Sequence, residues 1–372
     1  MGCYKYRFFP TSSQKIILQE WMNTSRFVYN KTVHCIQKEH NKINFFSLRN
    51  KLVPKKNIIS SQQWILNTPK EIRAYSVKEV VAAYKTCFTN LRTKTINKFK
   101  IGFRSKRKQN TETITLPKQS IKCAGNEFKV YCRKMKKSLK LNKEFLETVN
   151  HDFKILHIKK CDLWYICIPK QYDVSKRIAE NQSNPKVISI DPGVKTFLTM
   201  YDKNGKVIKI GEGDMKNKLI PMCERVDYLK SVLSKSKGIR KRNLSKRISK
   251  EMYKLKSYIL EIHNKTSLYL SKNYSLILIP NLGKLKMNGR RNRRTLRNWS
   301  HSKFIERLQF QCNKRGSTLK IVTEEYTSKT CGNCGWLNET LRNKDIFECK
   351  KCMLSIDRDT NGARNILLKN LK

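Results

Sequence analysis

Four cysteines near the C-terminal end of the sequence have the spacing of a metal site. Cys331 and Cys334 form one Cys-x2-Cys pair, and Cys349 and Cys352 form a second pair after fourteen intervening residues. Two such thiolate pairs can surround one Zn²⁺ ion tetrahedrally, and four protein ligands leave no open position for a substrate. We therefore predict a structural zinc ion, in preference to a redox pair or a chance cluster.

Two acidic stretches could bind a divalent cation. Asp191 directly follows the apolar run 187–190 and precedes a Pro-Gly turn, so its carboxylate lies at the end of a predicted strand. Asp357 and Asp359 precede a helical pattern, where an Asp can bind a metal ion or simply cap the helix. Carboxylate oxygens are the ligands that Mg²⁺ prefers, but each stretch alone is also typical of an ordinary turn or cap.

The positive charge of the chain is very large. Its 372 residues include 80 Lys+Arg and 28 Asp+Glu, which gives a net charge of +52 at pH 7. A field of this size indicates a nucleic-acid partner, although a ribosomal or chromatin packing protein would share it. Because 39% of the residues are hydrophobic, the chain can build a core, and this excludes a purely disordered basic tail.

Basic residues are concentrated in two runs that we expect to contact phosphate groups. One lies within 235–250 and contains no acidic residue, and the other lies in the loop before a helix predicted over 298–314. Dense blocks of one sign need phosphates nearby more than isolated surface charges do. The predicted nucleic-acid-binding residues are Lys235, Lys237, Arg240, Lys241, Arg242, Arg290, Arg291, Arg293, Arg294 and Arg297.

The sequence carries no signal for a membrane or for secretion. No run of about 18 apolar residues occurs, and the first residues lack an apolar core with a cleavage site. The 13 cysteines are an odd number in a long chain, which suits a reducing compartment. We expect an intracellular protein without a membrane partner, located in the nucleus if its host is eukaryotic and otherwise in the cytoplasm.

Hydrophobic periodicity divides the chain into three parts. Apolar residues at helical spacing predict a mainly helical first part, over about 11–37 and 71–98. Short alternating runs within 99–170 predict a small antiparallel β unit, and the polar stretch 171–185 predicts a domain boundary. Three strands, a long helix, a strand, a helix and a strand then indicate an α/β domain with a mixed sheet. The predicted strands of that domain span 187–190, 197–201, 207–210, 275–279 and 318–323.

Four motifs, in this order, resemble the transposon-encoded TnpB family. They are DPGVKTF at 191–197, YTSKTCGNCG at 326–335, CKKC at 349–352 and DRDTNGARNIL at 357–367. The segment YRFFPTSSQKIILQEWMNTSRFVYNKTV at 6–33 is similar to the N-terminal segment of the same family. TnpB proteins (IS200/IS605 OrfB-like) and their eukaryotic and viral relatives, the Fanzor proteins, are RNA-guided DNA nucleases related to type V CRISPR effectors. The resemblance covers nearly the whole chain.

The resemblance implies a fold of the α/β class with an additional small β domain. It implies a wedge-like β-barrel made of 1–10 and 99–180, with a helical recognition insert at 11–98. The remaining 186–372 would be a RuvC-like nuclease domain of RNase H-like fold. A zinc ribbon would be inserted in that domain at 327–354.

One position departs from the TnpB pattern. TnpB-like nucleases have a catalytic Glu at the end of the strand after the long helix, where this chain has Pro280. Fanzor proteins also have an inert residue there, and their acid lies shortly before the Thr-Ser that leads into the zinc ribbon. Aligning on that Thr-Ser assigns the acid to Glu324. Glu325 is a weaker candidate because adjacent strand residues face opposite sides. The Fanzor type is therefore the closer resemblance.

The resemblance implies an RNA-guided, Mg²⁺-dependent DNA endonuclease. Asp191, Glu324 and Asp359 would hold two Mg²⁺ ions, with Asp357 as a weaker candidate, and the four cysteines would hold the zinc ion. The partners would be a guide RNA and target double-stranded DNA, bound by a monomer. The alternative is a nuclease-inactive, repressor-like protein that binds DNA with an RNA guide or non-specifically, in which Pro280 marks lost catalysis. A transposase that joins strands itself has no separate recombinase motif in the sequence.

Overall fold

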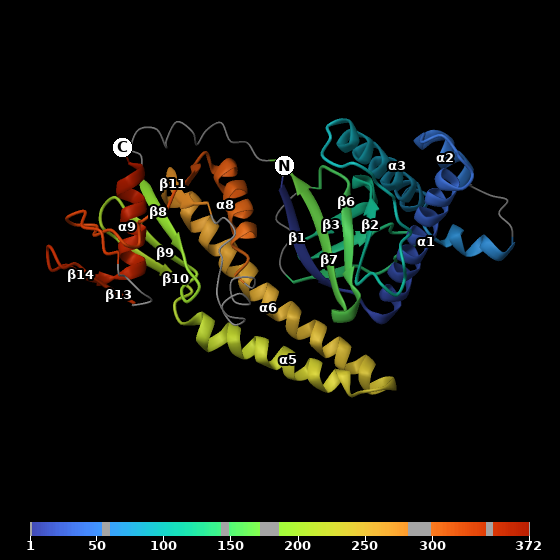
Figure 1. Ribbon diagram of the computed structural model, residues 1–372. Coiled ribbons are helices and arrows are strands. Elements are labelled where there is room, and N and C mark those ends of the chain that lie inside the picture. The colour runs from blue at the N-terminus through green and yellow to red at the C-terminus, as the bar shows by residue number, and fades with distance from the viewer. Residues whose placement is uncertain are drawn as a thin grey trace. The chain divides into compact units, whose positions relative to one another are not determined.

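The computed structural model describes residues 2–53, 60–142, 149–171, 186–281, 299–339 and 345–371. The chain divides into two compact units, Met1–Gln171 and Tyr172–Lys372. Figure 1 labels most of the helices and strands of the two units. Among the described residues, no helix is both long and apolar enough to cross a membrane.

A seven-stranded antiparallel sheet forms the core of the first unit. Its order is β2-β6-β7-β1-β5-β4-β3. One apolar cluster contains Ile114 of β2 and Phe128 of β4, which lie toward opposite ends of that order, so the sheet curls around a single core. The curled sheet is where the β unit was predicted, and its closure into a barrel remains a prediction. The strands are β1 (Gly2–Phe9), β2 (Thr111–Leu116), β3 (Ile121–Ala124), β4 (Glu127–Val130), β5 (Leu139–Leu141), β6 (Phe153–Ile158) and β7 (Leu163–Lys170).

Helices between β1 and β2 cover this sheet. They are α1 (Ser12–Gln37), α2 (Phe45–Leu52), the 3-10 helix η1 (Ser60–Asn67) and α3 (Lys70–Arg92). Two short 3-10 turns, η2 (Lys118–Ser120) and η3 (Lys159–Cys161), join strands. α1 begins with a capping box in which Thr11 and Gln14 bond each other's backbone N–H. Leu18 and Trp21 of α1 are buried in the core of the sheet.

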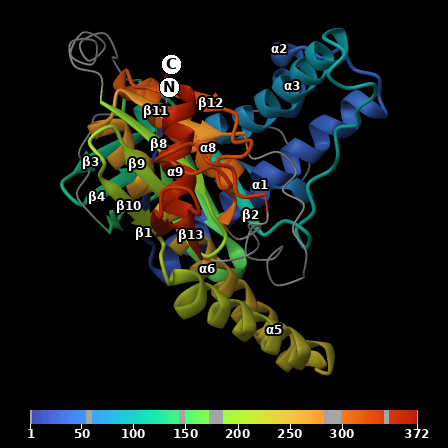
Figure 2. The same cartoon turned by 60° about the vertical axis from the view of Figure 1, so that its left-hand side comes forward.

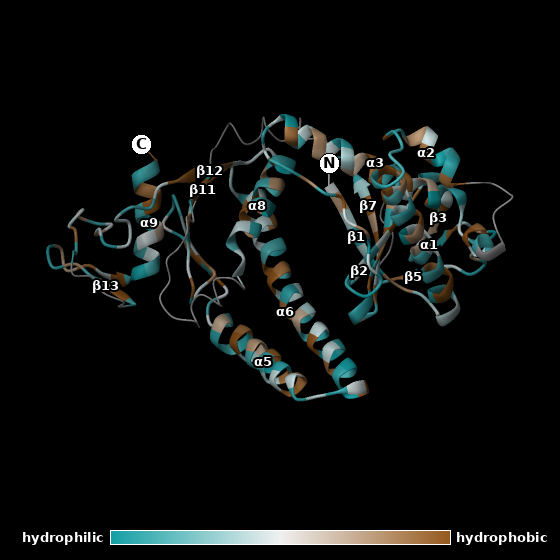
Figure 3. Ribbon diagram, turned by 45° about the vertical axis from the view of Figure 1, so that its right-hand side comes forward, coloured by the Kyte–Doolittle hydropathy of each residue, from teal (hydrophilic) through white to brown (hydrophobic). Residues whose placement is uncertain are grey.

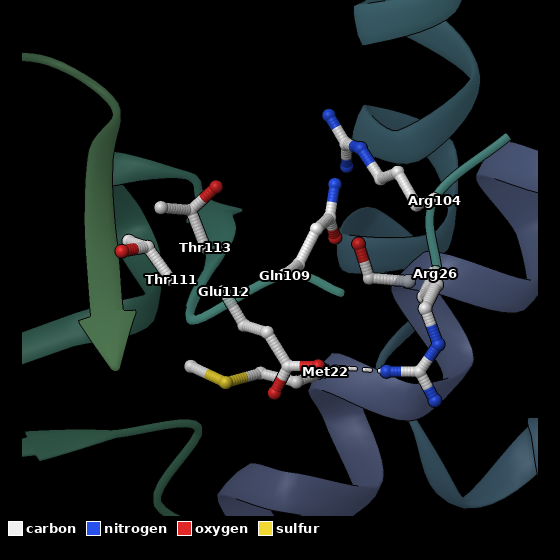
Figure 4. A pocket seen from close by; sticks show the side chains of 8 residues that line it. Met22, Arg26, Arg104, Gln109, Thr111, Glu112 and Thr113 are labelled. Carbon is white, nitrogen blue, oxygen red and sulfur yellow. Dashed lines mark hydrogen bonds and ion pairs between the residues drawn. The ribbon is translucent and has the colours of Figure 1, made fainter. Parts of the chain in front are cut away.

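A small polar hollow of about 110 Å³ lies between α1 and β2. Figure 4 shows Arg26 reaching across it to Glu112, whose Oε1 is 2.7 Å from Arg26 Nη1. Arg104, at the other side of the hollow, pairs with Glu79 at 3.0 Å. Both arginines already have a carboxylate partner, so neither charge is left for a ligand. The pair of Arg26 and Glu112 instead joins α1 to the sheet.

The second unit is built on a five-stranded mixed sheet of order β10-β9-β8-β11-β12. β8 is central, with β11 parallel to it and β12 parallel to β11. On the other side β9 is antiparallel to β8, and β10 is antiparallel to β9. The α/β pattern predicted from the sequence is thus present. The strands are β8 (Val187–Pro192), β9 (Leu198–Asp202), β10 (Val207–Ile210), β11 (Leu276–Pro280) and β12 (Thr318–Val322).

Helices cover both faces of this sheet. α9 (Arg358–Asn370) shares an apolar cluster with β8, β11 and β12 on one face. α6 (Gly238–Asn273) and α8 (His301–Arg315) share the cluster on the other face. Figure 2 shows α9 lying across β8 and β9, and Figure 3 shows hydrophobic and hydrophilic residues alternating along α6, as an amphipathic helix requires.

The long helix expected before β11 is α6, and a second helix precedes it to form a helical hairpin. The π-helical turn η4 (Met215–Leu219) leads into α5 (Ile220–Ser234), which packs against α6. The chain reverses before Gly238, whose φ of +57° is a conformation that favours glycine. A further hairpin of β13 (Ile346–Glu348) and β14 (Ser355–Asp357) leads into α9.

Candidate active site and zinc site

Asp191 lies at the end of the central strand β8, on the face that α9 covers. Successive side chains of a strand alternate between the two faces of the sheet. Val187 belongs to the apolar cluster under α9, whereas Ile188 and Ile190 belong to the cluster under α6 and α8. Asp191 has the parity of Val187, so its carboxylate faces α9.

Glu324 follows strand β12 on the same face. In the parallel pair of β11 and β12, Pro280 lies opposite Val322. Val322 belongs to the cluster under α9, and Glu324 comes two residues later with the same parity. The negative charge of Glu324 is one of the causes that raise the pKa of Asp191, which requires the two side chains to be near each other.

Helix α9 brings Asp359 to the same place. A Cβ atom added at Gly362 would come within 2.6 Å of Asp191 Oδ2, so this glycine permits the close approach of α9 to β8. The hydroxyl of Ser189 donates to the backbone carbonyl of Ala363 at 2.7 Å and fixes the contact. Asp359 precedes Gly362 by almost one helical turn and therefore lies on the same side of α9.

The two weaker candidates have other partners. Glu325 is exposed, and its Oε2 lies 3.6 Å from Lys369 Nζ. Asp357 caps α9, because its Oδ1 accepts from the backbone N–H and the hydroxyl of Thr360, both at 2.8 Å. Its Oδ2 lies 3.2 Å from Lys209 Nζ. Asp357 therefore already serves as a helix cap, and Glu325 already has a cationic neighbour.

The three remaining carboxylates repel one another. Burial, followed by the charges of Asp359 and Glu324, raises the pKa of Asp191 to about 8. Burial also raises the pKa of Glu324 and is the first cause of the raised pKa of Asp359. Among the residues that the structure describes, none of these three side chains has a hydrogen bond or an ion pair. A bound cation would relieve this repulsion.

The three carboxylates are spaced more widely than the four cysteines. Within the described ranges, the cysteine cluster is the one group of His, Cys, Asp or Glu residues whose ligand atoms all lie within 4.8 Å of one another. The carboxylates are therefore more widely spaced than the ligands of a single compact site.

The four cysteines form a compact cluster with the dimensions of a zinc site. Cys331 Sγ lies 3.6 Å from Cys352 Sγ, and Cys334 Sγ lies 3.5 Å from Cys349 Sγ. Four sulfur atoms around Zn²⁺ at about 2.3 Å would be roughly 3.8 Å apart, so the cluster fits this ion. Around it, Phe347 is fully buried in a small apolar core.

Two asparagines of α9 hold the cysteine module against this helix. The amide of Asn361 donates to the carbonyl of Thr330 at 2.7 Å and its Oδ1 accepts from the backbone N–H of Gly332 at 3.0 Å. The amide of Asn365 donates to the carbonyls of Thr327 and Thr330 at 2.8 and 2.6 Å. Sequence reasoning missed these residues, although two Asn four positions apart on an apolar helix face were a visible signal.

Comparison with known proteins gives two matching family models. The model described as "Cas12f1-like, TNB domain" matches residues 301–366, and the helix-turn-helix domain model of IS605 OrfB matches residues 3–43. A protein of Paramecium bursaria Chlorella virus 1 named as a transposase is 28% identical over 98% of this chain and 86% of its own length. A TnpB-like protein of Acanthamoeba polyphaga mimivirus is 27% identical over 99% of this chain and 73% of its own length.

A bacterial relative extends the similarity to a guided enzyme. "Putative RNA-guided DNA endonuclease InsQ" of Escherichia coli is 24% identical over 99% of this chain and 92% of its own length. Over nearly its whole length the chain is thus similar to TnpB-like proteins. The cysteine cluster, Glu324 and Asp359 all lie within the residues that the TNB model matches.

The basic residues predicted to contact nucleic acid fall into a described and an undescribed group. Lys235 and Lys237 lie where α5 ends and α6 begins, and the first turn of α6 follows. Five side chains at this tip are exposed, namely Lys235, Lys237, Arg240, Lys241 and Arg242. The second group, Arg290, Arg291, Arg293, Arg294 and Arg297, lies outside the described residues.

We expect Asp191→Asn to stabilise the protein in the absence of added Mg²⁺ at pH 8. The pKa of Asp191 is about 8 in the folded chain against 3.8 for an ordinary Asp, so folding is favoured below about pH 4 and this advantage is lost as the pH rises to about 8. At about 1.4 kcal/mol per pKa unit, the loss amounts to about 2–5 kcal/mol. Urea unfolding should show this difference at pH 8 and almost none at pH 4. An equal free energy of unfolding for both proteins at pH 8 would contradict the pKa shift.

Proposed function

We propose that the chain is an RNA-guided, Mg²⁺-dependent DNA endonuclease of the Fanzor type. The observation that carries the proposal is that Asp191, Glu324 and Asp359 gather at one face of one sheet and make no ion pair or side-chain hydrogen bond among the described residues. Similarity over 99% of the chain to a protein named as a putative RNA-guided DNA endonuclease supports the same activity. The domain names taken from the resemblance, including the RuvC-like domain, are part of this proposal.

Each of the three carboxylates has a distinct role in the proposed site. Bound Mg²⁺ ions would lower the pKa of a water molecule and stabilise the charge on the leaving oxygen. Asp191, which feels the charges of both other acids, would contact both ions, whereas Glu324 and Asp359 would each contact one. Strand β8 and the close contact at Gly362 would keep these oxygens fixed while DNA binds.

Pro280 and Glu324 favour the Fanzor type over the TnpB type. Leu278 lies in the cluster under α9, so Pro280, two residues later, has the parity of the face that carries Asp191. A Glu at 280 would therefore reach the site, as in the TnpB pattern, and a proline cannot. Because Pro280 lies opposite Val322, Glu324 follows the neighbouring strand at the same edge of the sheet. Glu324 would therefore replace the Glu that the TnpB pattern has at position 280, and would bind the metal ion in its place.

A guide RNA and target double-stranded DNA are the proposed partners, bound by a monomer. Base pairing with the RNA would select the target, while the protein would read a short adjacent motif and the shape of the heteroduplex. The zinc ion would be structural and would hold the cysteine module against α9. In a eukaryotic host the protein would act in the nucleus.

The experiment that tests the function begins with the RNA that co-purifies with the protein. Sequencing should identify one enriched RNA with a variable end. A duplex matching that end should be cut by the complex in Mg²⁺ and not after Mg²⁺ is omitted. If the RNA binds and the matching duplex is bound but never cut in Mg²⁺ or Mn²⁺, the nuclease-inactive DNA-binding function is correct instead.

We expect the tip between α5 and α6 to supply part of the affinity for RNA. Replacing Lys237, Arg240 and Lys241 by Gln removes three exposed charges and should weaken binding at low salt. The slope of log affinity against log salt should fall by about 0.7–0.9 for each phosphate group that the variant no longer neutralises. Lys265→Gln is the matched control, because Lys265 lies on the same helix and pairs with Glu261 at 2.8 Å. An unchanged slope in the triple variant would exclude the tip from the RNA-binding surface.

A further inference from the structure

The loop that carries the chain away from Asp191 is held by side chains from outside the sheet. The backbone carbonyl of Gly193 lies 3.3 Å from Nε2 of His301, the first residue of α8. The next carbonyl, that of Val194, accepts a hydrogen bond from the indole N–H of Trp299 at 3.0 Å. Two consecutive carbonyls, separated from the candidate metal ligand only by Pro192, are thus fixed by a short segment remote in sequence.

The loop itself is a tight turn. The backbone N–H of Gly193 donates to the carbonyl of Phe197 at 3.2 Å. A Cβ atom added at Gly193 would come within 2.6 Å of the carbonyl oxygen of Thr196, so only glycine fits this turn. Because the turn is this tight, a displacement of the Gly193 carbonyl would also displace the peptide units next to Asp191.

Aromatic packing fixes the position of the His301 ring. The ring stacks against Phe197, with centroids 5.0 Å apart and an interplanar angle of 18°. His263 of α6 stacks against the same phenyl ring at 5.2 Å, and its Nε2 lies 2.8 Å from the carbonyl of Trp299. Both α6 and α8 therefore support the segment that holds the loop.

The chemistry of His301 fits a fixed donor. Because a carbonyl oxygen can only accept, Nε2 of His301 carries the hydrogen, and Nδ1 keeps a lone pair. Nδ1 is buried and has no hydrogen-bond partner among the described residues, and the side chain is only 6% exposed. Burial also lowers the pKa of His301 to about 4, so the ring stays neutral at neutral pH.

We propose that His301 is a positioning residue for the metal site, which holds Asp191 in its productive orientation through the Gly193 carbonyl. This inference rests on the proposed nuclease function, since it gives Asp191 the role of a metal ligand. His301 touches neither a metal ion nor the substrate. Loss of partners that orient metal ligands costs about 10–100-fold in metal affinity or activity, and displacements of about 1 Å in a site have effects of similar size.

Two substitutions separate the hydrogen bond from the packing. His301→Phe keeps a ring that can stack on Phe197 but removes the donor, whereas the amide of His301→Gln can donate to the Gly193 carbonyl. If the Phe variant fails to fold, His301→Met takes its place, because it fills similar volume without a donor. His34→Phe is the matched control, since His34 lies in the first unit with its side chain 55% exposed.

The readout is the Mg²⁺ concentration that gives half-maximal DNA cleavage by the RNA-loaded protein, together with RNA affinity. The variant without a donor should need about 10–100-fold more Mg²⁺, with RNA affinity unchanged. The Gln variant should recover most of the loss, and His34→Phe should match the parent. The proposal is overturned if the folded variant without a donor has the half-maximal Mg²⁺ concentration of the parent. It is equally overturned if the Gln variant is as impaired as the Phe variant.

A second readout distinguishes failure of this inference from failure of the proposed function. Mn²⁺ binding to the RNA-loaded protein can be followed by electron paramagnetic resonance without any cleavage. If the parent binds Mn²⁺ but does not cut DNA, the nuclease function is wrong, and weaker Mn²⁺ binding by the variant without a donor still supports the role of His301. Equal Mn²⁺ binding by parent and variant refutes that role. A parent that binds no Mn²⁺ at Asp191 refutes both.

Discussion

Asp191→Ala, Glu324→Ala and Asp359→Ala should each abolish Mg²⁺-dependent DNA cleavage by the RNA-loaded protein. Each substitution removes one oxygen ligand from the face between β8, β12 and α9. A catalytic metal ion contributes several kcal/mol to the transition state, so we expect the rate to fall by about 10³-fold or more. RNA affinity should be nearly unchanged, because removing an acid from a strongly basic chain does not weaken its attraction to phosphates. Single-turnover cleavage and RNA titration measure the two quantities.

Glu325→Ala is the matched control for Glu324→Ala. The two positions are adjacent, but Glu325 is exposed and lies near Lys369, whereas Glu324 is half-buried and near Asp191. We expect Glu325→Ala to cut nearly as fast as the parent. If Glu325→Ala were inactive and Glu324→Ala active, the displaced acid would be the neighbouring residue, and the proposed geometry around Pro280 would be wrong.

Cys331→Ser should prevent the C-terminal part of the chain from folding. Structural zinc sites contribute folding free energy of about 10 kcal/mol or more, which exceeds the whole stability of many domains. Cys331 is buried, and the carbonyl of the preceding Thr330 accepts hydrogen bonds from Asn361 and Asn365 of α9. Loss of the module would therefore also free the helix that carries Asp359.

Zinc content and protease resistance measure this effect. The parent should contain one zinc ion per chain, and Cys331→Ser should contain less and be digested within residues 327–372. Cys132→Ser is the control, because Cys132 is exposed and lies in the other unit. An undegraded parent that contains no zinc would refute the assignment of the cluster.

Local sequence patterns were sufficient where one element determines the outcome. The apolar run at 187–190 predicts a buried strand that ends at Asp191, and β8 ends just beyond it at Pro192. The spacing of the four cysteines likewise predicts a cluster, which the structure contains. The assignment of Glu324 depended on the resemblance, because no local pattern relates Pro280 to a residue of the next strand.

Long-range contacts explain what the sequence could not predict. In the sequence, Gly362 is only a residue of low helix propensity within a predicted helix. The close approach of α9 to Asp191 shows why a side chain cannot be accommodated there. His301 lies 108 residues from the carbonyl that it contacts, so no spacing rule could find it. Helix α5, which precedes the expected long helix α6, was not predicted, because its apolar residues are buried by packing against α6.

A crossed cleavage assay tests the central claim most directly. Two guide RNAs, identical except in the guide segment, are loaded separately onto the protein, and each complex is incubated in Mg²⁺ with both matching duplexes. The account predicts that each complex cuts only the duplex that its RNA matches, and that Asp191→Ala cuts neither while binding both RNAs. Cutting of both duplexes by both complexes, or of neither by the parent, would contradict it.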